Sequence, residues 1–294
     1  MQTRIFYYYK IYMKRVFYFL AITLSIASCD VIDDPIVPFE GGYRSDLYGD
    51  PPMFTVTEQS GKNVLVEDFT AHQCGNCPPA AVIAEDLMDA NPGRVSPIAI
   101  HAGSLASTNA EYPTDWTCTE GDFFWNQLDF QANPVGRINR TGGPGNFYSP
   151  AQWEEIVETE LNIDTPVEIQ IETSWHSNAD HLNIHVYGQY FENTTGDHRL
   201  SILITESHLI GDQLDYSSDP EHITDYEFNH LLRGSVSGAE GLVVISDAQD
   251  GDHFQSDFTF NWNEEWVYEN CHLIAIVSDE DGYILNSLGI HLTN

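Results

Sequence analysis

Basic residues are scarce in this chain of 294 residues, which contains 11 lysines and arginines against 45 aspartates and glutamates. Four of the basic residues lie in the first 28 positions, where no acidic residue occurs. The rest of the chain therefore keeps seven basic residues and a formal charge of about −38. Such a surface repels nucleic acid and anionic lipid headgroups, so we expect no nucleic-acid partner, and it suits a medium of high ionic strength.

Long apolar runs are also lacking near the N-terminus, where residues 16–27 are too few to span a bilayer as a helix. Lys14 and Arg15 precede this run and small residues follow it, which is typical of a secretory signal peptide. The sequence Ile26-Ala27-Ser28-Cys29 resembles a bacterial lipobox, in which cleavage occurs before the cysteine and lipid is attached to it. This predicts a signal peptide over residues 1–28 and lipidation of Cys29. The alternative is an ordinary secretory signal in which Cys29 has no role.

Residues 29–52 are acidic and contain proline and glycine, with too little apolar surface to fold alone. We therefore expect a lipidated acidic tether. Acidic residues directly after the cysteine resemble the surface-export signal of Bacteroidetes lipoproteins. The predicted location is the outer membrane, with a lipid anchor and, as a further expectation, exposure at the cell surface.

Cysteine is rare, with five in the whole sequence. Four remain for other roles if Cys29 carries lipid, and the oxidising compartment beyond the inner membrane favours their pairing. Cys74 and Cys77 form the obvious local pair. Cys118 and Cys271 then either form a second disulfide across the chain or remain two buried thiols that behave as small apolar groups.

Strand and helix patterns alternate between residues 53 and 162. Residues 63–69 and 95–102 are apolar runs of β-forming residues, which predict two buried strands. Pro78 fits the first position of a helix that ends before Asn91-Pro92-Gly93. Further patterns predict a helix over 119–130, a strand at 133–139 and a helix after Ser149, where Gln152 completes a capping box. This alternation indicates an α/β domain with a mixed or parallel sheet.

The pattern changes at Thr165-Pro166. Short runs of alternating apolar and polar residues follow, separated by clusters of Asn, Asp and Gly. Several short strands with turn signals between them predict an all-β antiparallel sandwich over residues 163–294, with the domain boundary near residue 162.

The pair Cys74 and Cys77 stands where a buried strand meets the start of a helix. The unpaired N–H groups and the dipole of the helix favour the thiolate form of a cysteine at this point, and the thiolate is the species that attacks a disulfide. A second cysteine three residues later is close enough to displace the mixed disulfide that results. The spacing therefore suits thiol–disulfide exchange.

The surrounding residues resemble those of thioredoxins, whose active-site motif reads Asp-Phe-x-Ala-x-x-Cys-x-x-Cys and is matched here by residues 68–77. The resemblance implies a thioredoxin-like α/β N-terminal domain in which Cys74 attacks, Cys77 resolves and Asp68 assists proton transfer. It also implies that Pro134 is a cis-proline that shapes the substrate contact. Gln73 departs from the family, since thioredoxins have tryptophan there.

The chain is more similar still to a family of Bacteroidetes lipoproteins named after a twenty-eight-kilodalton outer membrane protein. The resemblance rests on VEDFTAHQCGNCPPAA, PIAIHAG, NPVGRINR and YEFNHLLRG, together with the lipobox, in this order. It implies a thioredoxin-like domain and a β-sandwich on an outer-membrane lipid anchor. The activity of the family is not settled, so the resemblance supplies no reaction.

Two alternatives remain for the cysteine pair. His72 and His101 could converge with the two cysteines on zinc or copper(I), although a single C-x-x-C is weak evidence for a metal site. The pair could instead be a permanent disulfide that braces the helix start.

The leading hypothesis is thiol–disulfide exchange on exported proteins, without metal or cofactor, in a cleft lined by His72, Gln73 and His101. The alternative is a non-catalytic binding or adhesion lipoprotein that meets a surface partner.

Overall fold

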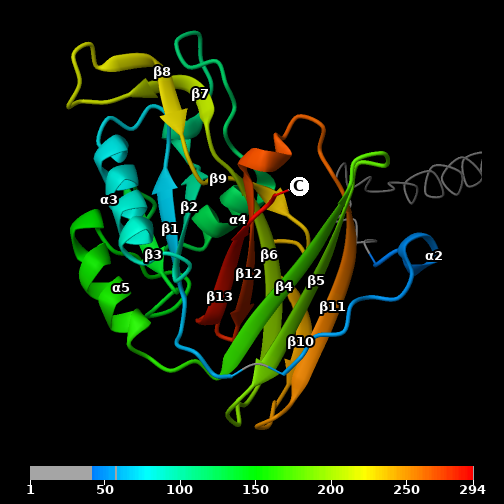
Figure 1. Ribbon diagram of the computed structural model, residues 1–294. Helices are drawn as coiled ribbons and strands as arrows, with labels where there is room; N and C mark the ends of the chain where they lie inside the picture. The colour runs from blue at the N-terminus through cyan, green and yellow to red at the C-terminus, as the bar shows by residue number, and fades with distance from the viewer. Residues whose placement is uncertain (1–41, 57, 294) are drawn as a thin grey trace, which may run out of the picture. The chain divides into compact units, whose positions relative to one another are not determined.

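Two parallel strands begin the larger sheet of the computed structural model, which describes residues 42–56 and 58–293 (Figure 1). β1 (Val64–Thr70) is buried along its whole length, and β2 (Val95–His101) lies beside it with Val64 opposite Val95. Helix α3 (Cys77–Ala90) connects them. β3 (Val135–Ile138) runs antiparallel to the other side of β1.

The same sheet continues into the second half of the chain, in the order β13-β12-β6-β9-β2-β1-β3. The connection is made where β9 pairs with β2, at Leu231 and Ala99. A short strand, β10, extends the sheet along the first half of β6. The later strands are β6 (Asp197–Glu206), β9 (Leu231–Ser235), β10 (Leu242–Ser246), β12 (Cys271–Ser278) and β13 (Ile284–His291).

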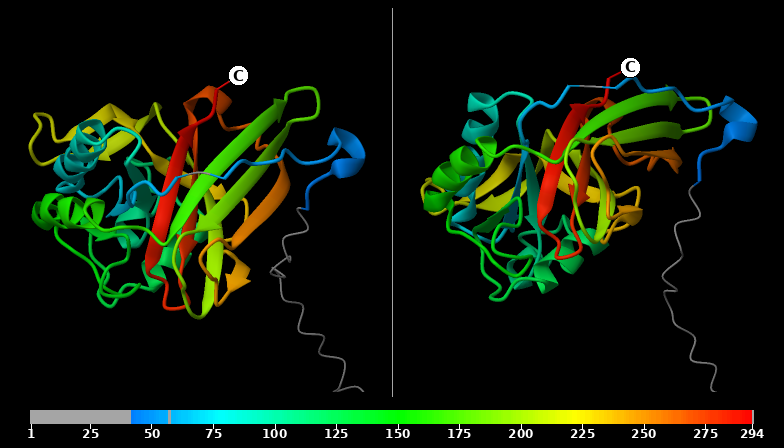
Figure 2. Two further views of the ribbon diagram at one scale, coloured as in Figure 1. Left: turned by 60° about the horizontal axis from the view of Figure 1, so that its bottom comes forward. Right: turned by 90° about the horizontal axis from the view of Figure 1, so that it is seen from below.

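A second sheet of three antiparallel strands packs on the β6–β12–β13 part of the first. It consists of β4 (Val167–His176), β5 (His181–Tyr190) and β11 (His253–Asn261), in the order β11-β5-β4. Alternate residues of the facing strands bury an apolar core between the sheets, including Ile184, Ile202 and Leu273. The chain from residue 42 to 56 runs along the outside of the smaller sheet, where the ring of Phe54 stacks on that of Tyr187 (Figure 2).

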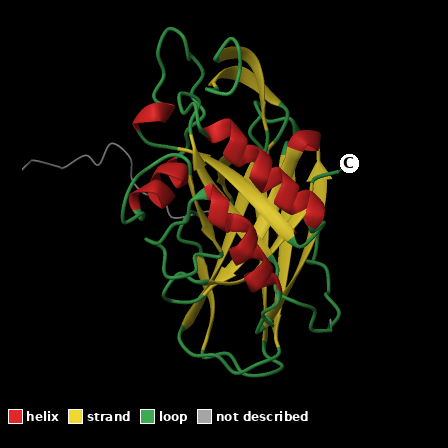
Figure 3. Cartoon of the chain, turned by 90° about the vertical axis from the view of Figure 1, so that its left-hand side faces the viewer, coloured by secondary structure: helices red, strands yellow, loops and turns green. Residues whose placement is uncertain are grey.

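Helices cover the β1–β2–β3 part of the larger sheet on both faces. α3 and α5 (Trp153–Leu161) pack on Val64, Val66 and Ile138 and lie side by side in Figure 3. α4 (Thr119–Asn126) covers the opposite face, where Phe124 meets Leu65 and Phe69. The remaining short helices are α2 (Ser45–Tyr48), η1 (Ser104–Ala106), η2 (Pro150–Gln152) and η3 (Tyr268–Asn270).

A hairpin stands apart from both sheets. Its strands, β7 (Leu209–Leu214) and β8 (His222–Phe228), pair only with each other among the described strands and form a two-stranded sheet. In Figure 1 the hairpin lies at the end of the molecule where β1 finishes and α3 begins.

The predicted fold class, a thioredoxin-like α/β domain followed by an all-β sandwich, is wrong. Strands make up most of the regular structure, and β1, β2 and β3 share one sheet with strands from beyond residue 163. The physical reason lies in β2, which is buried and needs a hydrogen-bonding partner on each side. The chain supplies the second partner from β9. The expected run of short strands after residue 163 is present.

Several predicted segments lie outside the described residues. These are the signal peptide over residues 1–28, Cys29, and the tether up to residue 41. The boundary predicted near residue 162 falls directly after α5. None of the helices between residues 42 and 293 has the length and apolar character needed to cross a membrane.

Candidate functional site

Cys74, in the loop that follows β1, forms a disulfide with Cys77, the first residue of α3. The S–S distance is 2.10 Å and the Cα atoms are 5.3 Å apart. Pro78 follows at the first turn of the helix, where its missing N–H costs nothing. The predicted local pair is therefore present. Cys74 and Cys77 are nevertheless only 3% and 2% exposed, so the sulfur atoms are covered by other parts of the chain.

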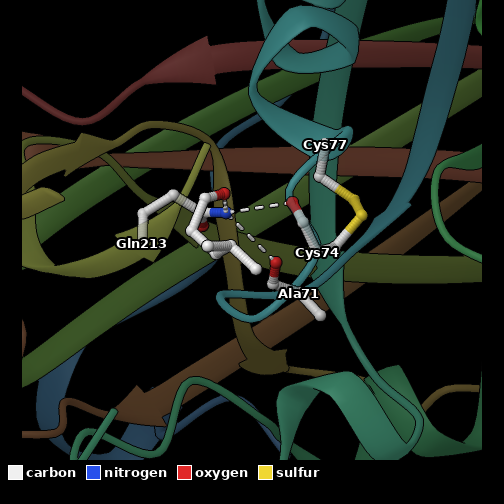
Figure 4. The surroundings of a disulfide bond; sticks show 5 residues. Ala71, Cys74, Cys77 and Gln213 are labelled. Carbon is white, nitrogen blue, oxygen red and sulfur yellow. Dashed lines mark hydrogen bonds between the residues drawn. A yellow bond between two sulfur atoms is a disulfide. The ribbon is translucent and has the colours of Figure 1, made fainter. Parts of the chain in front are cut away.

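Ala71 and Ala106 form a buried cluster with the two cysteines, and the β7–β8 hairpin packs on the backbone of the loop that carries them. The side-chain amide of Gln213, at the end of β7, donates to the carbonyl oxygen of Cys74 at 3.2 Å and lies 3.4 Å from that of Ala71 (Figure 4). The backbone N–H of Leu214 donates to the carbonyl of His72 at 2.8 Å. Two residues further, the N–H of Tyr216 donates to the carbonyl of Gly75 at 2.9 Å.

Gly75 allows this close approach. A Cβ at this position would lie 2.6 Å from the ring of Tyr216, closer than side-chain carbon atoms come in real proteins. The ring therefore rests directly on the backbone of the disulfide loop. Most of its outer surface remains open to solvent.

Asp68 lies on β1, two residues before the strand ends. It is buried, its Oδ1 has no hydrogen-bond partner in the described chain, and desolvation raises the pKa of its carboxyl group to about 8. A cavity of about 70 Å³ adjoins it, lined also by Ala81 and Ala84 of α3 and by Tyr226 of β8. Asp68 is thus held largely protonated at neutral pH, beneath the helix that Cys77 begins.

His72, Gln73 and His101, the residues expected to line a cleft, lie beside the disulfide loop, where His72 and His101 are buried. The rings of His72 and His101 are 6.1 Å apart, and Tyr112 stacks on His72. The Nε2 atom of His72 and the side-chain amide of Gln73 both face the carbonyl of Ser107, so these side chains bond to backbone. Burial lowers the pKa of His101 to about 3, with His72 adding to the effect.

The arrangement differs from the metal site considered from the sequence. Both sulfur atoms are used in the disulfide, and no group of three or more His, Cys, Asp or Glu side chains between residues 42 and 293 is placed to hold a metal ion. His101 instead meets the ring of Phe228, at the end of β8, edge-on.

Pro134 has the expected cis peptide bond, with Asn133 before it. It directly precedes β3, whose first residue, Val135, pairs with Phe69 of β1. This register places Pro134 at the end of β1 from which the disulfide loop departs.

Cys118 and Cys271 do not pair. Cys118 caps α4, where its sulfur accepts from the N–H of Gly121, whereas Cys271 begins β12 and its thiol donates to the carbonyl of Val267. Burial raises the pKa of each thiol to about 12. The alternative of two separate thiols therefore describes the structure, and the proposed second disulfide does not, because the two residues are held in different parts of the fold.

Sequence reasoning missed Gln213 and Tyr216. Nothing near them in the sequence marks a contact with the cysteine loop, because 139 residues separate Gln213 from Cys74. Only the packing of the hairpin brings them together.

The fold is that of a β-rich protein with a buried disulfide, built from two packed sheets and a separate hairpin. The family model described as outer membrane protein Omp28 matches residues 122–289, more than half of the sequence. The chain belongs to this family, and the predicted outer-membrane location is confirmed.

One solved structure has a related fold. HBP35 of Porphyromonas gingivalis is 18% identical, with a TM-score of 0.62 over 80% of this chain and 77% of that one. A domain of the outer membrane lipoprotein Omp28 from Porphyromonas gingivalis is 16% identical, with a TM-score of 0.29 over 44% of this chain and 89% of that one. Comparison with curated proteins gives no match. At these identities the first similarity concerns the fold alone.

Proposed function

We propose that this outer-membrane protein carries out thiol–disulfide exchange with exported proteins through Cys74 and Cys77. A thiolate of the substrate attacks the sulfur of Cys74, the S–S bond breaks, and Cys77 leaves as a thiolate that takes up a proton. A second substrate thiolate then attacks the mixed disulfide and releases Cys74. The substrate departs oxidised and the protein keeps both thiols; the reverse sequence reduces a substrate disulfide.

The supporting observation is the state of Asp68. A buried carboxyl group without a charged partner destabilises a fold, so its presence needs a reason other than packing. A disulfide that only braces a helix has no use for such a group. With a pKa of about 8, the carboxyl group of Asp68 can give a proton at neutral pH and take it back. The role proposed for Asp68 is to supply the proton that Cys77 needs.

The reduction potential of the Cys74–Cys77 pair tests this function. We expect a value above about −300 mV, within the range of thiol–disulfide oxidoreductases. Insulin reduction should accompany it, and Cys74→Ser should abolish the activity. Asp68→Asn should slow turnover while the potential changes little.

The burial of Cys74 supports a second candidate, a non-catalytic binding or adhesion protein whose disulfide stays closed. A potential below about −300 mV, with no insulin reduction, would favour this candidate and reject exchange. The partner would then be a surface molecule rather than a thiol substrate.

A lipid anchor on Cys29 is the remaining part of the proposal. Incorporation of radiolabelled palmitate into the wild type, and its loss in Cys29→Ser, would support lipidation. Antibody labelling of intact cells tests the proposed exposure at the cell surface.

A further inference from the structure

The segment from Gln213 to Tyr216 lies along the disulfide loop and is held to it by main-chain hydrogen bonds. Its alternate N–H groups, at Leu214 and Tyr216, donate to the carbonyls of His72 and Gly75. Main-chain bonds of this kind are how proteins commonly hold an extended peptide. The chain's own segment therefore takes up the backbone acceptors that an incoming polypeptide could use beside Cys74.

The buried side chain of Gln213 holds the segment against the loop. It is 2% exposed, and its amide nitrogen faces the carbonyls of Ala71, Cys74 and Leu214, the last at 2.7 Å. These carbonyls would lack this donor if the hairpin moved away, but water can replace it once the loop is open.

The base of the hairpin packs on the main part of the fold. There, Phe228 packs with Trp116 and Leu231, next to the main sheet. Toward its turn, the two strands pair with each other alone among the described strands, and Tyr216 is 58% exposed. Beyond the base, the hairpin is held by the buried side chain of Gln213 and by the stacking of His222 on Tyr112. A small element held by a few such contacts opens at a lower free energy than the whole fold.

We propose that the β7–β8 hairpin is a lid that keeps the Cys74–Cys77 disulfide closed, and that exchange requires its end, residues 213–216, to swing away from the loop. The inference deepens the proposed exchange function and rests on it for its biological meaning. Gly75 is the contact point that lets the lid shut, because only a residue without Cβ fits beneath the ring of Tyr216.

The rate at which dithiothreitol reduces the folded protein tests the lid. One thiolate of the reagent attacks Cys74, Cys77 leaves and is protonated by water, and the second thiolate closes the oxidised reagent while releasing Cys74. We expect Tyr216→Ala to raise the second-order rate constant by about tenfold, since an aromatic contact holds the closed state. Gly75→Ala should raise this rate constant as well, because the added methyl group would push the ring of Tyr216 away from the loop.

Ile210→Ala is the matched control, because Ile210 is an exposed apolar residue of the same hairpin at 57% exposure and lies outside the segment that contacts the loop. Its reduction rate should equal that of the wild type. Hydrogen exchange at the amides of Leu214 and Tyr216 should accelerate in Tyr216→Ala in step with reduction. Unchanged rates in both Tyr216→Ala and Gly75→Ala would overturn the lid.

The urea dependence of the wild-type reduction rate gives a second reading that needs no variant. Opening of a lid exposes little surface, so the slope should be far smaller than that of global unfolding. Equal slopes would overturn the proposal. These kinetic results are distinct from the reduction potential: a fast-reacting lid variant with a potential below about −300 mV would leave the lid standing and reject exchange.

Discussion

Asp68 and Glu67 are neighbours on β1 and are both buried, yet their carboxyl groups are held in opposite states. Burial disfavours the charge of Glu67, but Arg137 and Arg140 outweigh that cost and lower its pKa. Asp68 has no such partner, and burial alone raises its pKa. Adjacent residues of a strand point to opposite faces, so one carboxyl group meets the arginines while the other faces the α3 side.

The carboxyl group of Asp68 should make the stability of the fold fall as pH rises. Its pKa is about 8 in the folded protein, against 3.8 for an aspartate in an open chain, so the folded state holds a proton that the unfolded state has lost between these pH values. The contribution is fully present below pH 3.8 and is lost as pH rises through 8. Asp68→Asn should remove this slope. The unfolding free energy of the variant minus that of the wild type should therefore be several kcal/mol higher at pH 8 than at pH 4.

Urea unfolding of both proteins across this pH range checks the prediction. Asp86→Asn, at an exposed site on α3, is the control and should follow the wild type. Parallel pH profiles for Asp68→Asn and wild type would show that the carboxyl group of Asp68 titrates normally.

At the scale of elements, β1 and β3 are joined by a buried charge cluster in addition to their backbone bonds. Glu67 stands opposite Arg137 in the register, and its carboxylate accepts from the guanidinium of Arg137 at 2.8 Å and from that of Arg140 at 2.9 Å. The arginines also face the rings of Phe69 and Phe124. The cluster thus connects the strand before the disulfide loop to the strand that follows Pro134.

Glu67→Gln should destabilise the protein by about 3–5 kcal/mol, because it leaves two guanidinium groups buried without a counter-charge. Chemical denaturation measures the loss, and Glu154→Gln, on the exposed side of α5, provides the comparison. A loss below about 1 kcal/mol would mean that water reaches the arginines.

Individual elements of the first half were predicted well because local signals define them. Pro78 and the stop at Asn91 bracket α3, and the capping box at Ser149 and Gln152 is present. Pairing between distant strands leaves no comparable local signal, since the same apolar run suits many neighbours. That is why β9 was not recognised as the partner of β2, and why the cover over Cys74 was missed.

At the scale of the molecule, the shared sheet makes the two halves depend on each other. The core beneath α4 combines Leu65 and Ile98 with Leu203, Leu232 and Ile274 from the later strands. Removing the later strands would expose apolar residues of β1 and β2 and leave the β2 edge unpaired.

We therefore expect a fragment ending at residue 162 to lack a cooperative thermal transition, whereas a chain that starts at residue 29 and continues to residue 294 should unfold in one step. Calorimetry with near-UV circular dichroism tests both statements. A fragment of residues 53–162 that melts cooperatively would show that the first half folds alone.

The charge of the molecule leads to a second prediction at this scale. With a formal charge of about −38 after residue 28, the folded state suffers strong self-repulsion, which salt screens. The melting temperature should rise between about 10 mM and about 500 mM NaCl. Choline chloride should have the same effect, and a rise with sodium alone would point to specific ion binding instead of screening.

The position of the hairpin late in the sequence affects when the disulfide can form during export. Gln213 lies 139 residues after Cys74, so it crosses the inner membrane long after the two cysteines have done so. During that interval the hairpin cannot pack on the cysteine loop, and the periplasmic oxidising system can reach the two thiols freely. We expect the bond to form on the emerging polypeptide, before the hairpin has packed on the loop that carries the two cysteines.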